Sequence, residues 1–309
     1  MNREVEDTRS VTMLDWAEAA AGRMQRAGLF FGHGTATAFD EACWMISHSL
    51  DIAPDFDNEL MRSNLTIEEA AALERLLQQR IETRQPLAYL IGEAWFAGLL
   101  FKVDATTLVP RSPLAEPIVQ GLSPWLRLDR RLRVLDVGTG SGCIAAALAW
   151  HWPALQVDAT DISAAALARA AANLRRLGLA ERVRLLESDV YSALEDGPDQ
   201  PGRYDLVVSN PPYVPNASMD ELPVEYLHEP DMALRAGEDG LDIVRRLLEG
   251  APDHLTPGGF VLLEVGEAAP QTQSLLGDVA SIWLEFENGG EGVVLLDRAA
   301  CLQWREENP

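Results

Sequence analysis

The sequence predicts an α/β protein with a mostly parallel β-sheet, preceded by a smaller helical part. Two observations carry this prediction. From Leu132 onward, short apolar runs rich in valine and leucine alternate with stretches of helical length, a pattern typical of parallel strands joined by helices. Up to about residue 85, apolar residues instead recur every three or four positions, which is helical spacing.

The N-terminal helices are expected over residues 13–28, 36–50 and 66–84. Thr66 and Glu69 have the spacing of a capping box at the start of the third helix. In the second helix, one expected apolar face consists of Phe39, Cys43, Ile46 and Leu50. We therefore expect a helical domain over 1–85, a linker over 86–112 that contains a hairpin at 93–103, and a main domain over 113–309.

The main domain is expected to begin with a helix near Leu114 and then to alternate strands with helices. The expected strands are 133–138, 155–159, 182–187, 204–209 and 259–265, and the expected helices are 143–150, 163–177, 239–250 and 268–276. A closing antiparallel pair is expected at 282–287 and 292–296. Alternation of this kind implies a mostly parallel sheet that is covered by helices on both faces.

The composition favours a basic protein partner and disfavours nucleic acid. A length of 309 residues suggests two domains. Lys and Arg number 25 against 48 Asp and Glu, a net charge of -23 that repels phosphates and attracts cationic surfaces.

The targeting and cysteine patterns indicate a cytoplasmic protein without a membrane segment. The first residues are polar and acidic, unlike a signal peptide, and no apolar run reaches the length of a membrane span. Cys43, Cys143 and Cys301 lie far apart without metal-like spacing, so we expect buried thiols in a reducing cytosol and no metal.

A glycine-rich loop, Asp136-Val-Gly-Thr-Gly-Ser-Gly142, lies between the first expected strand and its helix. Glycines there allow a ligand to approach the backbone, and Asp161 at the end of the next strand can accept both ribose hydroxyls of a nucleoside. Both a nicotinamide dinucleotide and S-adenosylmethionine fit so far. The third glycine comes one residue too early for the dinucleotide pattern, and Asp136 suits an ammonium group, so S-adenosylmethionine is favoured. Ser188-Asp189-Val190 is placed either to meet the adenine or simply to end a strand.

A second stretch, Asn210-Pro-Pro-Tyr213, stops the buried strand 204–209 abruptly. The two prolines make the turn stiff and remove two backbone donors, so it presents mainly carbonyl acceptors. Together with the Asn210 amide oxygen and the flat ring of Tyr213, such a turn can hold a planar –NH2 group. The alternative is an ordinary proline-rich turn.

Taken together, Asp136–Gly142, Asp161, Ser188-Asp189 and Asn210–Tyr213 resemble the class I S-adenosylmethionine-dependent methyltransferases. More narrowly, they resemble the glutamine-amide methyltransferases of the HemK/Prm group. The resemblance covers nearly the whole chain, because that group has counterparts of Pro86–Gly92, Leu108–Arg111, Glu229-Pro230, Ala233-Leu234, Asp239–Asp242 and Leu263–Gly266. It implies a Rossmann-like sheet with an antiparallel closing strand, and a helical N-terminal domain that recognises the substrate.

The resemblance also implies the ligands and the site residues. S-adenosylmethionine would be the methyl donor, S-adenosylhomocysteine the product, and no metal would take part. The implied cofactor-binding residues are Asp136, Gly138, Thr139, Gly140, Gly142, Asp161, Ile162, Asp189, Val190 and Asn210. Asn210, Pro211 and Tyr213 are implied to be catalytic, and with Pro212 and Arg111 to bind substrate. Val190 replaces a tryptophan that often stacks near adenine in the release-factor branch, so no stacking role is transferred to it.

Two segments distinguish the branches of this group. The branch acting on peptide-chain release factors typically continues the Pro-Arg pair as Pro-Asp-Thr-Glu, whereas this chain reads Pro110-Arg-Ser-Pro-Leu-Ala-Glu116. This segment and Phe31–Thr35 resemble the branch that methylates large-subunit ribosomal protein three. The expected partner is therefore a basic ribosomal protein, with release factors as the alternative; the sequence leaves the oligomeric state open.

In the implied reaction, the Asn210 side-chain oxygen and the Pro211 carbonyl accept the two N–H bonds of a glutamine amide, so that its nitrogen faces the methyl group. A DNA adenine methyltransferase uses the same tetrapeptide on a flipped base, but it needs a basic DNA-binding face that a net charge of -23 does not suggest. A non-catalytic binding module is disfavoured because both motifs are intact.

Overall fold

The computed structural model describes residues 11–54, 56–194, 203–287 and 289–308, which divide into two compact units. Unit 1 consists of Met1–Gly92 and Pro223–His228, and unit 2 of Glu93–Leu222 and Glu229–Pro309. The short segment Pro223–His228 therefore belongs to unit 1 although the chain on both sides of it belongs to unit 2. Within the described residues, none of the helices is long and apolar enough to cross a membrane.

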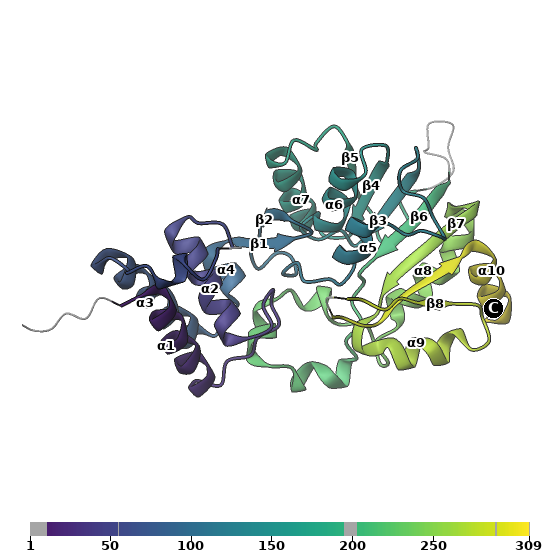
Figure 1. The fold of residues 1–309 in the computed structure, drawn as a ribbon. Helices are drawn as coiled ribbons and strands as arrows, with labels where there is room; N and C mark the ends of the chain where they lie inside the picture. The colour runs from purple at the N-terminus through teal and green to yellow at the C-terminus, as the bar shows by residue number, and fades with distance from the viewer. Residues whose placement is uncertain (1–10, 55, 195–202, 288, 309) are drawn as a thin grey trace, which may run out of the picture. The chain divides into compact units, whose positions relative to one another are not determined.

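Unit 1 is helical, as the sequence predicts. Its elements are α1 (Met13–Arg26), α2 (Ala38–Leu50), η1 (Leu60–Arg62), α3 (Ile67–Thr83), α4 (Leu87–Ile91) and η3 (Val224–His228); Figure 1 shows α1–α4 as one group. The predicted capping box begins α3: Glu69 N–H donates to Thr66 Oγ1 over 3.2 Å, and Thr66 N–H donates to Glu69 Oε2 over 2.8 Å.

The predicted apolar face of α2 is only partly correct. Ile46 is fully buried, but Phe39 is 38% exposed and Cys43 only half-buried. The buried face instead runs through Ala38, Ala42 and Met45. Small residues let α2 pack closely against α1, so the contact follows the alanines rather than the largest side chain.

Unit 1 buries a charged cluster formed by Arg80, Glu41 and Glu225. Arg80 Nε donates to Glu41 Oε1 over 2.7 Å, with both side chains at most 3% exposed. Glu225 has a fully buried carboxylate that accepts hydrogen bonds from Phe30 N (3.0 Å) and pairs with Arg84 Nη2 (2.8 Å). Glu225 lies in Pro223–His228, so these bonds attach that segment to unit 1.

His33 lies in the same unit and is buried against aromatic rings. Its ring centroid is 4.6 Å from that of Tyr226 and 6.2 Å from that of Phe30. This structural environment agrees with the loop of aromatics and glycines that the sequence shows around it, and His33 belongs to the packing of unit 1.

Unit 2 contains the predicted parallel sheet, with the strand order β5-β4-β3-β6-β7-β9-β8. The strands are β3 (Arg133–Val137), β4 (Gln156–Asp161), β5 (Val183–Glu187), β6 (Tyr204–Ser209), β7 (Leu255–Glu264), β8 (Ile282–Trp283) and β9 (Val293–Asp297). β3 to β7 pair in parallel, and β9 closes the sheet by pairing antiparallel with both β7 and β8.

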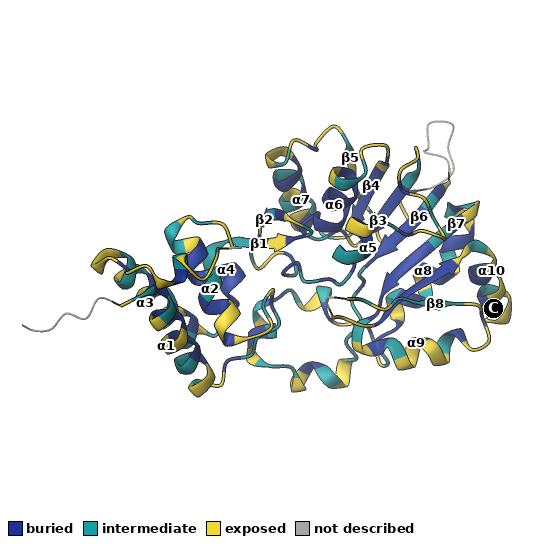
Figure 2. Cartoon of the chain, in the orientation of Figure 1, coloured by how far each residue is buried: buried dark blue, intermediate teal, exposed yellow. Residues whose placement is uncertain are grey.

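Helices cover both faces of this sheet. The helices of unit 2 are α5 (Ala115–Gln120), α6 (Cys143–His151), α7 (Ala164–Arg176), α8 (Asp242–His254), α9 (Ala269–Leu276) and α10 (Arg298–Glu307). Alternate strand residues such as Leu135, Val207 and Val261 form one core with α8, α9 and α10, while α6 packs on the opposite face of β3–β5. Figure 2 shows the central strands buried along their length, as expected for a sheet covered on both sides.

Four elements differ from the sequence prediction. β7 begins at Leu255, four residues early, and α8 extends to His254 with Pro252 in its last turn. β8 has only two residues, and α10 is an additional helix that the sequence pattern did not bring out. Asp297 caps α10 through Ala300 N, and Trp304 packs into the core, so tertiary burial rather than periodicity stabilises this helix.

The hairpin predicted at 93–103 consists of β1 (Glu93–Phe96) and β2 (Leu99–Lys102). Asn173 of α7 holds it in unit 2 by accepting a hydrogen bond from Lys102 N (2.9 Å) and donating to Lys102 O (3.0 Å). The same amide donates to Ser141 O over 2.9 Å. One buried amide therefore connects the hairpin to the glycine-rich loop.

Candidate active site

The candidate site lies at the carboxyl edge of the sheet, where β3, β4, β6 and β7 end. Val137, the last residue of β3, pairs with Thr160 of β4 and with Ser209 of β6, and Ser209 pairs with Leu263 of β7. The glycine loop and the Asn210–Tyr213 turn therefore leave the sheet from neighbouring strands. The connections from β3 run in opposite directions here, which is where open α/β sheets bind ligands.

The glycine loop follows β3 with its backbone partly tied to β4. Gly138 N and Thr139 N both donate to Thr160 O, over 2.8 and 2.9 Å. Gly138 (φ +74°) and Gly140 (φ +55°) face open space, because a Cβ at either position would meet no atom within 4 Å. Gly142 serves packing instead, since its Cβ would come within 3.0 Å of the Ala170 Cβ.

Asp136 is fully buried beneath this loop. Its Oδ2 accepts hydrogen bonds from Thr139 Oγ1 (2.6 Å) and Ala145 N (3.1 Å). Its Oδ1 has no hydrogen-bond partner among the described residues. Burial raises the pKa of Asp136 to about 7. A buried carboxylate oxygen without a partner suits a ligand that brings a positive charge.

Asp161 ends β4 and orders the loops on both sides. Its Oδ2 accepts Gly140 N and its Oδ1 accepts Ser163 N, each over 2.8 Å. Burial raises the pKa of Asp161. Ile162 beside it is 54% exposed, so a carboxylate and an apolar side chain stand together at this strand end, as a nucleoside requires.

The predicted pair Asp189 and Val190 follows β5 and has an unusual backbone. Val190 is buried with φ +55°, a conformation that β-branched residues rarely adopt. The exposed Asp189 carboxylate pairs with Arg246 over 2.8 Å, and Asp189 N donates to Ser192 Oγ. The structure thus places this turn at the site edge, with the Asp189 side chain already engaged by α8.

The Asn210-Pro-Pro-Tyr213 turn is braced from several sides. Ser209 Oγ donates to Val137 O over 2.7 Å, which joins β6 to β3 just before the turn. A Cβ on Gly266 would lie 2.8 Å from the Tyr213 ring, and a Cβ on Gly240 would lie 2.4 Å from Tyr213 O. Tyr213 is therefore packed closely against Gly240 and Gly266, and the stiffness of the turn stays a prediction.

Two residues of this site, Glu264 and Ser112, were not singled out from the sequence. Glu264 ends β7 beside Asn210 and is only 5% exposed. Burial raises its pKa to about 7, against the lowering effect of hydrogen bonds from Ser112 and the Asn210 side chain. The sequence signal that could have identified Glu264 was a carboxylate at the end of an apolar strand. This residue lies in the segment Leu263–Gly266, which the resemblance already included.

Arg111 stands close by, and Glu229 binds its guanidinium. Arg111 Nη1 and Nη2 donate to Glu229 Oε1 (2.6 Å) and Oε2 (2.8 Å), and Val109 N donates to Oε1 as well (3.0 Å). The side chain of Glu229 is completely buried. This bidentate pair connects the 109–112 segment to the chain beyond the turn, whereas a substrate contact by Arg111 remains a prediction.

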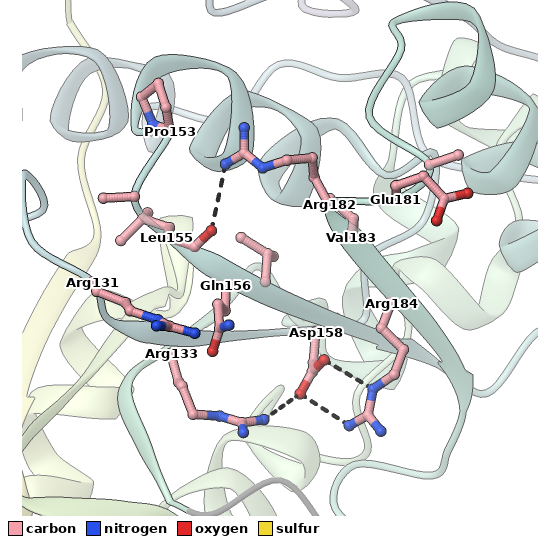
Figure 3. Close-up of a pocket in the computed structure, with 13 residues that line it drawn as sticks. Arg131, Arg133, Pro153, Leu155, Gln156, Asp158, Glu181, Arg182, Val183 and Arg184 are labelled. Atoms are coloured by element: carbon pink, nitrogen blue, oxygen red, sulfur yellow. Dashed lines mark hydrogen bonds and ion pairs between the residues drawn. The ribbon is translucent and has the colours of Figure 1, made fainter.

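A separate cavity of about 850 Å³ lies at the opposite, amino edge of β3–β5 (Figure 3). Arg133 and Arg184 both point to Asp158, at 3.0 and 2.9 Å, and Arg182 donates to Leu155 O. These arginines brace the strand starts. The cavity is thus distinct from the candidate site, which is at the other end of the same strands.

The site residues fit S-adenosylmethionine. The partnerless Asp136 oxygen can accept an ammonium, the open faces of Gly138 and Gly140 leave room for the ligand, and Asp161 stands where ribose hydroxyls are bound in such sheets. Together with the strand order, these features define a class I S-adenosylmethionine-dependent methyltransferase.

Comparison with known proteins agrees and narrows the class. Residues 120–237 match the family model "Methyltransferase small domain". The hMettl16 catalytic domain, solved with an RNA hairpin, shares the fold with a TM-score of 0.52 at 17% identity, covering 81% of this chain and 91% of that one.

Curated relatives extend over both units. A ribosomal protein uL3 glutamine methyltransferase of Xanthomonas campestris is 45% identical over 93% of this chain and 91% of its own, and one of Bordetella pertussis is 39% identical over 93% and 95%. The chain belongs to the family of the ribosomal protein uL3 glutamine methyltransferases.

Proposed function

We propose that this protein transfers a methyl group from S-adenosylmethionine to the side-chain amide nitrogen of a glutamine in ribosomal protein uL3. The observation that carries the proposal is the extent of the relatives' identity, which covers about 93% of the chain and so includes the helical unit as well as the methyltransferase unit. We assign recognition of the protein substrate to the N-terminal helical domain, expected over 1–85.

The cofactor would be held by the groups described above. Asp136 would accept the ammonium of its amino-acid end, and Asp161 would accept the ribose hydroxyls. Ile162, Asp189 and Val190 would border the adenine. When bound, S-adenosylmethionine supplies an electrophilic methyl group. We propose a reaction that involves no metal, as the resemblance implies.

The substrate amide would be held by the Asn210–Tyr213 turn. An amide nitrogen is a poor nucleophile because its lone pair is delocalised into the carbonyl. Asn210 Oδ1 and the Pro211 carbonyl would accept its two N–H bonds, and the Tyr213 ring would pack on its plane. This arrangement orients the nitrogen and stabilises the positive charge that develops on it. Transfer forms one N–C bond, breaks one S–C bond and releases one proton from nitrogen.

The direct test is methylation of purified uL3, with a release factor offered in parallel. We expect the mass of one methyl group to be added to uL3 and mapped to a glutamine by fragmentation. Asn210→Ala should lower kcat by roughly a hundredfold and leave the Kd for S-adenosylhomocysteine nearly unchanged, because the main role that we propose for Asn210 is to bind the substrate amide.

Two results would contradict the proposal. Preferential methylation of the release factor would assign the enzyme to the other branch of the group while leaving the chemistry intact. A wild-type rate for Asn210→Ala at saturating substrate would remove the amide-binding role of the turn.

A further inference from the structure

Glu264 stands beside the turn that we propose binds the substrate amide, in a position set by strand register. Ser209 of β6 lies opposite Leu263 of β7, so the next residues, Asn210 and Glu264, leave the two strands side by side. On its other side Glu264 pairs with the apolar residue Val293 of β9. The Glu264 side chain is therefore buried between the turn and an apolar neighbour on β9.

The hydrogen bonds around Glu264 have defined directions. Ser112 Oγ accepts a hydrogen bond from Leu114 N over 3.1 Å, and its hydroxyl proton is donated to Glu264 Oε2. The Asn210 side chain also interacts with this carboxyl and favours its ionised form, so Asn210 supplies an N–H donor. The charged group acting on Glu264 is Arg111, which is itself held by Glu229.

The direction of the Asn210 bond decides which end of its amide is available. A carboxylate only accepts hydrogen bonds, so it binds the –NH2 end of an amide and leaves the carbonyl end turned away. A protonated carboxyl group can instead donate to the amide oxygen. The ionisation state of Glu264 therefore selects the orientation of Asn210.

Building on the proposed function, we propose that Glu264 is a positioning residue: held by Ser112, its carboxylate binds the –NH2 of Asn210 and so directs Asn210 Oδ1 toward the glutamine amide. Without this partner, the Asn210 amide can rotate and present a donor to the two substrate N–H groups, which repels them. Glu264 itself does not contact substrate in this assignment.

The test compares Glu264→Gln with Glu267→Gln, an identical substitution three residues on at an exposed position. Methylation of free uL3 with radiolabelled S-adenosylmethionine gives kcat across pH, and titration gives the Kd for S-adenosylhomocysteine. We expect Glu264→Gln to lower kcat about tenfold to a hundredfold, the usual effect of a misplaced reacting group, with an unchanged Kd. Glu267→Gln should match the wild type.

The pH profile separates positioning from a merely structural role. Because protonated Glu264 would compete for Asn210 Oδ1, wild-type kcat should fall as pH drops below about 7. We call this decrease the acid limb of the pH profile, and Glu264→Gln should lack it. In Ser112→Ala, a hydrogen bond that lowers the Glu264 pKa is lost, so the limb should move to higher pH. This shift can be measured even if Glu264→Gln does not fold.

Several outcomes would overturn the inference. These are a Glu264→Gln enzyme with wild-type kcat and an intact acid limb, a Ser112→Ala limb that does not move, or a loss of affinity for S-adenosylhomocysteine that accounts for the loss of rate. If the wild-type enzyme methylates no glutamine in uL3, the proposed function is wrong. The wild-type reaction alone therefore separates that result from a failure of the Glu264 inference.

Discussion

Asp161 orders two loops, and a substitution can test whether it also binds the ribose, as we propose. Its carboxylate orders the glycine loop through Gly140 N and the start of α7 through Ser163 N, and it stands where ribose hydroxyls would bind. We expect Asp161→Ala to weaken binding of S-adenosylmethionine by about 1.5–3 kcal/mol, the value of hydrogen bonds to a charged acceptor. Isothermal titration measures this directly, and unchanged affinity would refute the ribose-binding role.

The proposed contact of Asp136 with the ammonium group of the cofactor predicts that cofactor affinity depends on pH. Its pKa of about 7 in the protein lies well above the ordinary value of 3.8 because the carboxyl group is buried. A raised pKa means that the neutral form stabilises the folded protein at low pH, and this contribution is lost as pH rises from about 4 through about 7. A cationic ligand favours the ionised form, so binding below pH 7 must release a proton from Asp136.

We therefore expect the affinity for S-adenosylhomocysteine to increase between about pH 5.5 and about pH 7.5, by up to about tenfold per pH unit below the pKa of Asp136. Calorimetry in buffers of different ionisation enthalpy should show net proton release on binding. Asp136→Asn serves as the control, because it should bind weakly with a flatter pH dependence. Proton-neutral binding by the wild type at low pH would contradict an ammonium contact.

At the scale of elements, the buried charged cluster joins α2, α3 and the segment Pro223–His228. Arg80 is fully buried between Glu41 and Glu225. Replacing it leaves two buried carboxylates without their shared partner, so Arg80→Ala should destabilise unit 1 by about 3–5 kcal/mol. Burial already raises the pKa of Glu41, and this variant should become more stable at acidic pH, where Glu41 is neutral; Glu225 keeps Arg84 as a partner.

The measurement is chemical denaturation monitored by far-ultraviolet circular dichroism. Arg23→Ala is the matched control, because its ion pair with Glu74 is part-exposed, with side-chain exposures of 34% and 50%. Exposed pairs contribute at most about 1 kcal/mol. Equal losses for the two arginine variants would show that burial does not distinguish these pairs.

At the scale of the whole molecule, a net charge of -23 should govern how the substrate is captured. Unassembled ribosomal proteins carry Lys and Arg that rRNA has not yet neutralised, and an acidic enzyme attracts them over the screening length of the solution. We expect free uL3 to be methylated faster than mature large subunits, where rRNA phosphates compete for the same cations. Raising salt should lower kcat/KM and leave kcat nearly constant.

Initial rates of methylation of free uL3 and of intact subunits, measured at several salt concentrations, test this expectation. A neutral peptide that contains the recipient glutamine is the control, since its kcat/KM should respond little to salt. Faster methylation of mature subunits, or a kcat/KM for free uL3 that is indifferent to salt, would exclude electrostatic capture.

Much of the site could be located in the sequence because its two loops carry local signatures. The glycines after β3 permit backbone conformations and ligand approach that other residues do not, and the prolines after β6 restrict the backbone, whatever surrounds them. Glu264 carries no such signature. A single carboxylate after an apolar strand becomes informative only once β7 is known to lie beside β6 with Leu263 opposite Ser209.

The sequence by itself determined the alternation of strands and helices, the capping box at Thr66 and the backbone character of both loops, permissive at the glycines and restricted at the prolines, since each depends on neighbours within a few residues. Tertiary structure decided what depends on distant partners. The covered face of α2 follows its small residues against α1, α10 forms where Trp304 reaches the core, and Glu225 belongs to unit 1, where it pairs with the buried Arg80 and the partly exposed Arg84. Burial and register arise from contacts between residues far apart in the chain, which no local pattern encodes.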